Sequence, residues 1–443
     1  MNSTPSRGLW RPCSTGELIA AGKLAIGDGY RAKNSELSTS GLPFARAGNI
    51  DGGFHFEAAD RFPEEDLGKV GEKISQPGDV VFTSKGTVGR LAFVRETTPR
   101  FVYAPQLCFW RSLDRAVIDP HWLYYWMWGL EFRQQMSGVK RQTDMADYVS
   151  LMDQRGMEIT LPSIAIQRAI AGVLGSLDDK IEQNRRTALA LERLARAVFR
   201  AWFVDFEPVR AKVAGAASFP SMPQEIFDAL PSAFVDSNIG HVPEGWDVKA
   251  IGDVVTVRGG GTPSTKDPNY WDGGVHCWAT PRDMSRLSHP VLLDTERRIT
   301  DFGVNSISSG LLPAGTVLMS SRAPVGYLAI AGVPTAINQG FIAMTCDGPL
   351  PPTFVLNWAL ASMEAIKGHA SGTTFPEISK KSFRPLPVIE PSGDVIAAYQ
   401  QLTDPSFGLL TACVRENVRL AEVRDYLLPR LLSGSLRVAA HIG

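Results

Sequence analysis

Residues 78–92 read Gly78-Asp-Val-Val-Phe-Thr-Ser-Lys-Gly-Thr-Val-Gly-Arg-Leu-Ala92, and residues 315–329 match them without a gap as Gly315-Thr-Val-Leu-Met-Ser-Ser-Arg-Ala-Pro-Val-Gly-Tyr-Leu-Ala329. The offset between the two stretches is 237 residues (315 − 78). Further matches follow at similar offsets: Ala104-Pro-Gln106 with Ile337-Asn-Gln339, Ser137-Gly138 with Ser371-Gly372, and Leu161-Pro162 with Leu386-Pro387. Two copies are too few for a solenoid. The duplication therefore predicts a pseudo-two-fold molecule, which suits a ligand of roughly two-fold shape such as duplex DNA.

Each copy ends in a segment with helical periodicity. After Ser163 the repeating positions step by four and three residues, at Ile170, Leu174, Leu177, Ile181, Asn184, Ala188, Leu191, Ala195, Val198 and Trp202. The second series is Phe407, Leu410, Val414, Asn417, Ala421, Arg424 and Leu428. This spacing is a heptad seam. Residues 163–202 then form a rod of roughly 60 Å, at about 1.5 Å per residue.

The two seams are in phase, since Asn417 follows Asn184 by 233 residues (417 − 184). Each apolar stripe is narrow, so we expect the two helices to bury these stripes on each other, running antiparallel. Asn184 and Asn417 then set the helix register at some cost in stability. The alternative is that they are ordinary solvent-facing positions. Asp404-Pro405 is expected to start or kink the second helix, because proline disfavours the helical interior.

The pattern of apolar runs, turn residues and helical segments along the whole chain predicts an α+β fold with two globular α/β domains separated by two long antiparallel helices. Short apolar runs broken by Gly, Pro and Asp indicate strands and turns in both globular parts. We expect a first domain at 1–160, a central helix at 161–207, a connector at 208–244, a second domain at 245–388 and a C-terminal helix at 389–443.

Composition is that of an ordinary globular protein, with 443 residues of which 44% are hydrophobic and 21% charged. A net charge of -1 gives no support to a strongly basic DNA-coating protein, so a partner has to supply much of the phosphate-binding charge.

The five cysteines are single and odd in number, which favours a reducing cytoplasm over a disulfide framework. The N-terminus has no signal-peptide pattern, and the apolar window Trp122–Leu130 is too short for a bilayer, so we expect a core helix there and no membrane contact.

No catalytic constellation is visible in the sequence. Gly259-Gly-Gly261 lacks the following Lys-Ser/Thr of a phosphate-binding loop, and the seven histidines show no metal-ligand spacing. Asp267-Pro-Asn-Tyr270 resembles the Asp-Pro-Pro-Tyr loop of amino-methyltransferases but lacks the second proline, which favours a plain turn. We therefore expect no catalytic residue, no metal and no cofactor in this chain, and we expect that it is not an enzyme.

Recognition residues are expected in equivalent loops of the two copies. Ser84-Lys85 and Ser321-Arg322 follow equivalent strands, where small hydroxyls and a cation can approach phosphates or a base edge. The alternative is a hairpin turn with a solvated cation. Gln106, Asn338 and Gln339 can pair with adenine or merely cap a strand end. The full set of expected DNA contacts is Arg46, Ser84, Lys85, Arg90, Gln106, Lys140, Arg141, Gln142, Thr262, Arg282, Ser321, Arg322, Asn338, Gln339, Thr373 and Thr374.

Taken together, several motifs make the chain similar to the specificity subunits of type I restriction-modification systems. These are Leu161-Pro with Gln167, Leu177-Asp-Asp-Lys-Ile-Glu-Gln-Asn184, Phe199-Arg-Ala-Trp-Phe-Val-Asp-Phe-Glu-Pro208, Gly261-Thr-Pro263 with Tyr270-Trp271, Trp278-Ala-Thr-Pro-Arg-Asp283, and Arg424-Asp-Tyr-Leu-Leu-Pro-Arg-Leu-Leu-Ser-Gly434. The resemblance covers nearly the full length, though the first 40 residues match poorly.

The resemblance implies that the two globular domains are target recognition domains, each reading one half of a split, asymmetric sequence in double-stranded DNA. It implies two methylation subunits that use S-adenosylmethionine, and restriction subunits that use ATP and Mg. A helical rod of about 60 Å spans about 18 base pairs and can set the unread spacer. The alternatives are a recognition module of another DNA-modifying assembly, a protein-only scaffold and, least favoured, a stand-alone methyltransferase.

Overall fold

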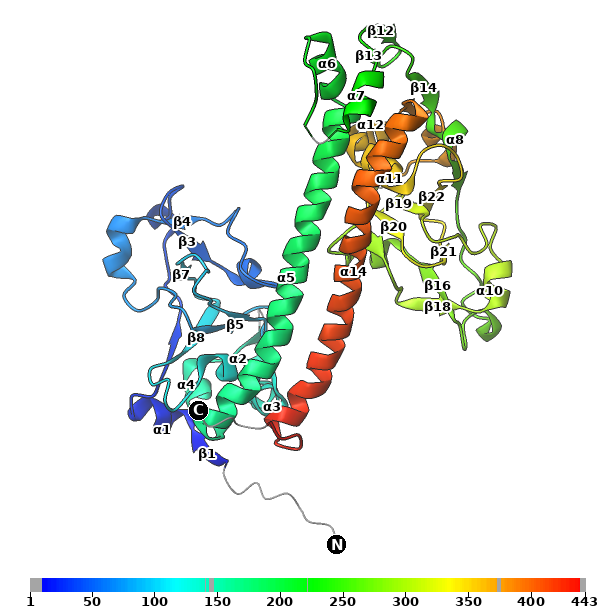
Figure 1. The fold of residues 1–443 in the computed structure, drawn as a ribbon. Coiled ribbons are helices and arrows are strands. Elements are labelled where there is room, and N and C mark those ends of the chain that lie inside the picture. The colour runs from blue at the N-terminus through cyan, green and yellow to red at the C-terminus, as the bar shows by residue number, and fades with distance from the viewer. Residues whose placement is uncertain (1–9, 140, 143–146, 221, 373–375, 439–443) are drawn as a thin grey trace. The chain divides into compact units, whose positions relative to one another are not determined.

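A computed structural model of the chain describes residues 10–139, 141–142, 147–220, 222–372 and 376–438. It forms two compact units, one of Met1–Ile181 with Arg419–Gly443 and one of Glu182–Val418. Both divisions fall inside the two longest helices, α5 (Ile164–Phe203) and α14 (Gly393–Leu432), which Figure 1 draws in green and in orange to red. The domain boundaries expected from the sequence lie at the ends of these helices, and they stay a prediction.

Three sheets of the first unit recur in the second unit, and a further short sheet pairs β9 (Arg141–Gln142) with β10 (Asp147–Tyr148). A four-stranded antiparallel sheet has the order β2 (Leu24–Asp28), β8 (Leu107–Ser112), β5 (Val80–Thr83) and β6 (Leu91–Phe93). A three-stranded sheet has the order β4 (Arg61–Phe62), β3 (Leu42–Ala45) and β7 (Val102–Tyr103). The third sheet pairs β1 (Arg11–Ser14) with β11 (Glu158–Leu161).

The second unit repeats these sheets in the same order. Its largest sheet runs β15 (Thr256–Arg258), β22 (Phe341–Thr345), β19 (Val317–Ser320) and β20 (Leu328–Ala331), and then adds β17 (Val291–Leu292). The others are β18 (Arg297–Ile299), β16 (His276–Ala279) and β21 (Thr335–Ile337), and the pair β14 (Asp247–Ala250) with β23 (Pro387–Glu390).

The register of the strands is repeated as well. Val80 faces Phe93 across the β5–β6 pair, and Val317 faces Ile330 across the β19–β20 pair. Residues 80–82 and 317–319 are fully buried, as continuous apolar runs predict for strands covered on both faces. The pseudo-two-fold repeat predicted from the sequence is therefore confirmed in the topology.

An aromatic helix covers the large sheet of the first unit. It is α2 (Pro120–Trp128), which begins after Asp119, whose Oδ1 accepts hydrogen bonds from the backbone N–H groups of His121 and Trp122 at 3.0 Å. Trp122 and Trp126 are buried in the same cluster as Trp110 of β8. This confirms the expected core helix, which is followed by α3 (Leu130–Val139). The corresponding helices of the second unit are α11 (Pro352–Ala361) and α12 (Met363–Gly368). In the described ranges, no helix is long and apolar enough to cross a membrane.

The two long helices run antiparallel, as predicted. Within the first unit, Asp178 of α5 pairs with Arg424 of α14 at 2.9 Å. Within the second, the Asn184 Nδ2 donates to the Asn417 Oδ1 at 3.0 Å, and the rings of Phe203 and Tyr399 lie 5.2 Å apart. Residue numbers that increase along α5 are thus paired with residue numbers that decrease along α14, which is the antiparallel arrangement. Asn184 is only 3% exposed, so it is not a solvent-facing position, while its register-setting role stays a prediction.

Of the two alternatives predicted for Asp404-Pro405, the start of the second helix is excluded, because α14 begins at Gly393 and continues through Pro405, while a kink there stays a prediction. Proline removes one hydrogen bond to the preceding turn. Pro405 is exposed, where water can satisfy the freed carbonyl, whereas Tyr399 and Leu410 on either side of it are buried. Tertiary packing on both sides therefore outweighs the local helix-breaking effect.

The connector between α5 and the second set of strands is structured. It contains α6 (Glu207–Val213), α7 (Gln224–Ala229), β12 (Phe234–Ser237) and β13 (Gly240–Pro243). Phe206 and Trp246 at its two ends are buried with their rings 5.9 Å apart, and the Trp246 ring lies 6.0 Å from that of Phe203 in α5. The remaining short elements are α1 (Thr15–Ala20), α4 (Leu151–Arg155), α8 (Ile251–Val254), α9 (Pro281–Ser285), α10 (Asp301–Asn305), α13 (Lys380–Phe383), β9 (Arg141–Gln142), β10 (Asp147–Tyr148) and the 3-10 turns 34–36, 47–50, 64–69 and 268–270.

Candidate nucleic-acid interface

Most described candidate residues of the first unit lie at the ends of neighbouring strands. We call this group of strand ends the strand-end edge. Thr83 of β5 faces Leu107 of β8, and Ala45 of β3 faces Tyr103 of β7. Arg46, Ser84 and Gln106 adjoin these strand ends, and the Arg90 Nη1 donates to the Ala47 carbonyl at 3.2 Å. Residues from four separate stretches of sequence are thus brought to a common edge.

The second unit presents the same edge. Ser320 of β19 faces Phe341 of β22, and Ala279 of β16 faces Ile337 of β21. Ser321, Asn338 and Gln339 continue directly from these strand ends, and Arg282 lies in α9 just after β16. Thr262 joins the same group, because its Oγ1 donates to the Gln339 Oε1 at 2.6 Å.

One hydroxyl in each unit holds the loop that carries the predicted cation. The Thr83 Oγ1 donates to the Thr87 carbonyl and accepts from the Arg90 N–H at 3.0 Å. The Ser320 Oγ donates to the Pro324 carbonyl at 2.7 Å and accepts from the Tyr327 N–H at 2.8 Å. The same two bonds at the same offset make residues 84–89 and 321–326 equivalent, internally braced loops.

The serines in these loops are more buried than the sequence suggested. Ser84 is 6% exposed and Ser321 is 3% exposed, and the Ser84 Oγ donates to the Gln106 carbonyl at 3.3 Å. Lys85 is exposed and Arg322 is half-exposed. The serines thus hold the loops in place, while the cations are the side chains that a ligand can reach. Contact of any of them with DNA stays a prediction.

Acidic side chains accompany the arginines at both edges. Arg46 pairs with Asp60 at 2.5 Å and Arg90 with Asp51 at 3.1 Å in the first unit. In the second, Arg282 lies 3.6 Å from Glu296, and Arg322 lies 3.7 Å from Glu377. Such exposed pairs contribute about 0–1 kcal/mol, so a phosphate or a base edge can replace the carboxylate at little cost.

A second segment lies beside the cationic loop in each unit. Lys85 forms a backbone bridge with Tyr148 of β10, and Arg322 forms one with Glu377. Strand β10 pairs in turn with β9, which contains the predicted residues Arg141 and Gln142. The side chains of these two residues, and the predicted residues Lys140, Thr373 and Thr374, lie outside the described part of the structure.

The amides at the strand ends differ in their surroundings. The Asn338 Oδ1 accepts from the Gly340 N–H at 2.9 Å, which is the capping role that the sequence left open. The Gln106 Oε1 is buried without a partner among the described residues. A buried acceptor without a donor is costly in a folded protein, so it marks a position that a donor from a ligand or from water can complete.

Glycines let the chain pass close to a strand end in both units, which sequence reasoning missed. A Cβ on Gly29 would lie 2.0 Å from the Ala104 carbonyl oxygen, and one on Gly260 would lie 1.9 Å from that of Ile337. Gly259-Gly-Gly261 is therefore a site of close backbone approach. The signal was available, since Gly27-Asp-Gly29 stands at the equivalent place in the first copy.

Among the described residues, a buried ion pair beneath the strand ends is found in the first unit and has no counterpart at the equivalent positions of the second. The Arg111 Nε lies 2.6 Å from the Asp79 Oδ1, and the Tyr103 hydroxyl donates to the Asp79 Oδ2 at 2.7 Å. Burial, and then the nearby Asp79 carboxylate, raises the pKa of Tyr103 well above its ordinary value. In the second unit Thr316 and Thr345 occupy the equivalent positions. No local motif in the sequence distinguishes such a pair from surface charges.

The described residues offer no metal cluster, since no three of their His, Cys, Asp and Glu side chains gather as ligands would. Asp267 accepts a hydrogen bond from the Asn269 N–H at 3.0 Å and caps a short turn, which agrees with the interpretation of Asp267-Pro-Asn-Tyr270 as a plain turn.

Comparison with known proteins gives consistent matches. A family model for the type I restriction modification DNA specificity domain matches residues 243–401. The specificity subunit of the type I restriction enzyme HindI of Haemophilus influenzae is 25% identical over 414 residues, covering 84% of this chain and 89% of its own. That of the MjaIX enzyme of Methanocaldococcus jannaschii is 38% identical over 161 residues, which are 36% of this chain and 37% of that protein. A crystal structure of a type I restriction-modification S subunit from M. genitalium has the same fold, with a TM-score of 0.61 at 14% identity over 97% of this chain and 98% of that one.

Proposed function

Because this chain belongs to the non-catalytic DNA-specificity subunits of type I restriction-modification systems, we propose that its two units read the two halves of one split, asymmetric DNA site. Each unit presents the strand-end edge described above to one half-site. The side chains that we assign to base or phosphate contact are the exposed cations and amides, with Lys85 and Arg322 at the centre of each edge.

One observation carries this proposal: the two units share a backbone plan at the edge and differ in the side chains displayed there. Arg90 of the first loop corresponds to Tyr327 of the second. Gln106 corresponds to Gly340, which accepts the equivalent backbone hydrogen bond, and not to Gln339 as the sequence match of 104–106 with 337–339 predicted; the strand register shifts that match by one residue. Different donors and acceptors on the same scaffold select different base edges in the major groove. The two half-sites should therefore differ in sequence.

Other subunits complete the assembly. We assign the long helices as the surface that binds two methylation subunits, as the resemblance to specificity subunits implies, and α5 and α14 expose large apolar side chains that such partners can cover. These are Val173, Leu189, Leu194, Leu409, Val418, Val423 and Tyr426. The methylation subunits bring S-adenosylmethionine and accept the flipped adenine, and restriction subunits bring ATP and Mg. The complex acts in the cytoplasm.

The test is DNA binding by the full chain, measured with and without its proposed methylation subunit. A pool of randomised duplexes is bound, and the retained fraction is sequenced. We expect weak binding by the chain alone, because its net charge is -1, and a split motif of two unlike halves when the partner is present.

Single variants assign each half to a unit. Lys85→Ala should relax the preference within one half-site, and Arg322→Ala should relax the other, each by about 1–3 kcal/mol. Arg11→Ala and Lys249→Ala serve as matched controls, since these cations lie in β1 and β14, away from the edge. A bound pool without sequence preference, or a motif that neither Lys85→Ala nor Arg322→Ala alters, would contradict the proposal.

A further inference from the structure

Arg297 of β18 in the second unit is stacked on an aromatic ring. Its guanidinium carbon lies 3.5 Å from the centroid of the Trp271 ring and 5.6 Å from that of Trp278. Stacking on an indole face attracts the cation and leaves the N–H donors of the guanidinium at its rim. Arg297 is exposed, and it forms no ion pair or side-chain hydrogen bond with any residue that the structure describes. The side chain is therefore oriented, while its donors remain open to a ligand.

The ring beneath this arginine is itself fixed. The Trp271 Nε1 donates to the Ser264 carbonyl at 2.9 Å, and its ring meets that of Trp278 edge to face, with centroids 5.1 Å apart. Trp278 is 4% exposed, and its Nε1 donates to the Gly261 carbonyl at 3.1 Å. Trp271 thus gives Arg297 a defined surface on which to lie.

Neighbouring arginines of the second unit are compensated by carboxylates. Arg282 and Arg286 lie 3.6 and 2.7 Å from the same carboxylate oxygen of Glu296. Arg298, the next residue along β18, lies 2.9 Å from Asp294. Such pairs reduce the charge that these arginines offer to a ligand.

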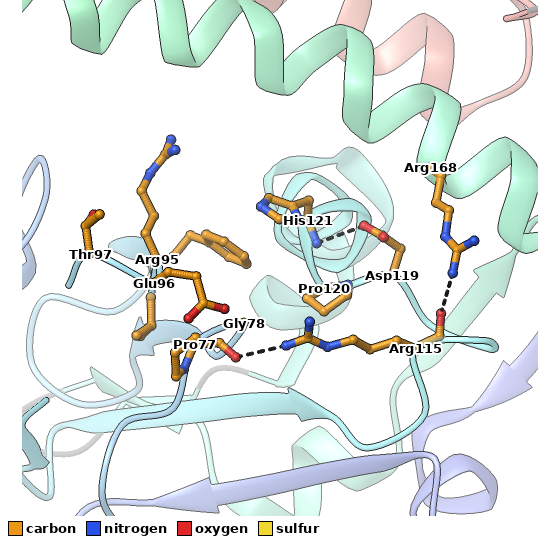
Figure 2. A pocket seen from close by; sticks show the side chains of 12 residues that line it. Pro77, Gly78, Arg95, Glu96, Thr97, Arg115, Asp119, Pro120, His121 and Arg168 are labelled. Carbon is orange, nitrogen blue, oxygen red and sulfur yellow. Dashed lines mark hydrogen bonds between the residues drawn. The ribbon is translucent and has the colours of Figure 1, made fainter.

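Arginines that gather around a cavity of about 560 Å³ in the first unit are also engaged. Figure 2 shows Arg95, Arg115 and Arg168 there. Arg95 pairs with Asp179 at 2.6 Å, and further carboxylates line the same wall. The other two guanidiniums donate to backbone carbonyls at 3.4 and 3.3 Å, along dashed lines in the figure. Arg297 differs from these arginines in having aromatic rings as its partners among the described residues.

The internal repeat places Arg297 at the strand-end edge. Arg297 faces Trp278 across the β18–β16 pair, and the equivalent residue of β3 is Phe44, whose N–H donates to the Asp60 carbonyl at 2.8 Å. Asp60 therefore corresponds to Arg297. The Asp60 Oδ2 lies 2.5 Å from the Nη1 of Arg46, which is a predicted DNA contact of the first unit. A side chain at this position thus reaches the strand-end edge.

The two units carry opposite charges at this position. In the first unit the Asp60 carboxylate is neutralised by Arg46. In the second unit Thr280 stands where the first has Arg46, and the cation of Arg297 stands where the first has the carboxylate. The charge and its orientation therefore belong to the second unit.

A guanidinium held in one plane suits an acceptor pair that lies in one plane. Guanine presents such a pair, O6 and N7, in the major groove of DNA, and arginine is its commonest partner. A phosphate does not require a fixed plane, because a lysine binds it as a point charge. The stacking of Arg297 on Trp271 therefore favours a base contact over a phosphate contact.

We propose that Arg297 is a specificity-determining residue that donates two hydrogen bonds to one guanine of the second half-site, and that Trp271 is its positioning residue. This assignment rests on the proposed function, since it requires that the second unit reads DNA. The guanine belongs to one half-site, because the first unit has Asp60 at this place.

The test repeats the selection from randomised duplexes with the full chain and its proposed methylation subunit. Arg297→Lys keeps the charge and removes the planar fork, so we expect about a tenfold loss of preference for guanine at one position of one half-site, with the other positions unchanged. Trp271→Leu should weaken the same preference, whereas Trp271→Phe should retain it. Arg298→Lys is the matched control and should behave as wild type. Circular dichroism melting checks that each variant is folded.

A modified base tests the contact itself. Replacing that guanine by 7-deazaguanine removes the N7 acceptor and keeps the base pair. We expect wild type to bind the modified duplex about fivefold more weakly, the effect of one hydrogen bond, and Arg297→Lys to bind both duplexes equally.

Four results would overturn the assignment while leaving the proposed function intact. They are a wild-type motif that Arg297→Lys does not alter, an equal weakening of all sequences by Arg297→Lys, which indicates a phosphate contact, the same response of both proteins to 7-deazaguanine, and an unchanged preference in Trp271→Leu. If the wild-type complex selects no motif at all, the proposed function fails and the assignment fails with it.

Discussion

Gly29 and Gly260 hold the closest backbone approaches at the two candidate edges. Substitution by alanine places a methyl group about 2 Å from a carbonyl oxygen, and neither backbone can yield without displacing a strand end. We expect Gly29→Ala to destabilise the protein by about 1–3 kcal/mol, the usual cost of overpacking. Gly138→Ala is the matched control, since a Cβ there meets no atom within 4 Å. Thermal unfolding compares them, and equal melting temperatures would contradict the close approach.

Tyr103 makes stability depend on pH in the alkaline range. Its pKa is raised in the folded state, so the unfolded chain ionises this tyrosine near pH 10.0 while the folded chain keeps the phenol neutral. The stability it confers is therefore complete below that pH and is lost as pH rises toward the folded pKa. Above about pH 10 the unfolding free energy of wild type should fall more steeply than that of Tyr103→Phe, by about 1.4 kcal/mol per pH unit.

Urea unfolding at several alkaline pH values measures this difference in slope. The other tyrosines cancel in the comparison, because both proteins contain them. Tyr426→Phe, which alters an exposed ring, is the control. Tyr103→Phe also loses the hydrogen bond to Asp79, which lowers its unfolding free energy by the same amount at every pH. The test therefore compares how steeply the unfolding free energy falls with pH, and not its absolute value. Parallel curves for wild type and Tyr103→Phe would show that the phenol is not held neutral.

At the scale of elements, Asn184 and Asn417 form a polar contact in the helix seam, where the Asn184 Nδ2 also donates to the Glu416 Oε2 at 2.7 Å. Asn184→Leu leaves the Asn417 oxygen without its donor, and we expect a loss of about 0.5–1.5 kcal/mol. The double variant Asn184→Leu with Asn417→Leu should recover that loss and exceed wild type, because the seam becomes apolar at this position. Arg185→Ala, an exposed neighbour, is the control. Additive losses in the two single variants would mean that the side chains do not act as a pair.

Elements with a regular pattern were predictable from the sequence, and those fixed by distant contacts were not. The heptad positions of α5 and α14 are buried or half-buried as expected, because a period of three and four residues defines one helix face. The continuation of α14 from Gly393 through Pro405 was not predictable from the local sequence, since Val395 and Tyr399 are held by residues far away in the chain.

Prediction of the candidate site from the sequence was limited in the same way. Equivalent loops around Lys85 and Arg322 were predictable from the repeat, but the burial of Ser84 was not, because it depends on the carbonyl of Gln106 from another strand. Likewise β17 has only two residues, and its place at a sheet edge follows from its pairing with β20 rather than from its own sequence.

At the scale of the whole molecule, both long helices pass from one unit into the other along the chain. If the helices set the distance between half-sites, one added heptad in each should lengthen the unread spacer by about 3 base pairs, since seven residues add about 10 Å. The design duplicates residues 178–184 in α5 and the facing residues 417–423 in α14, which keeps the seam matched. Both half-sites should stay unchanged, and an unaltered spacer would refute the ruler.

The central claim is that one chain reads two different half-sites, and mapping of methylated adenines across a genome tests it most directly. Cells lacking other adenine methylation would express this chain with its proposed methylation subunit. We predict one split motif with two unlike halves and an unread spacer of constant length, absent when this chain is omitted. A continuous motif, a motif with identical halves, or the same methylation without this chain would contradict the account.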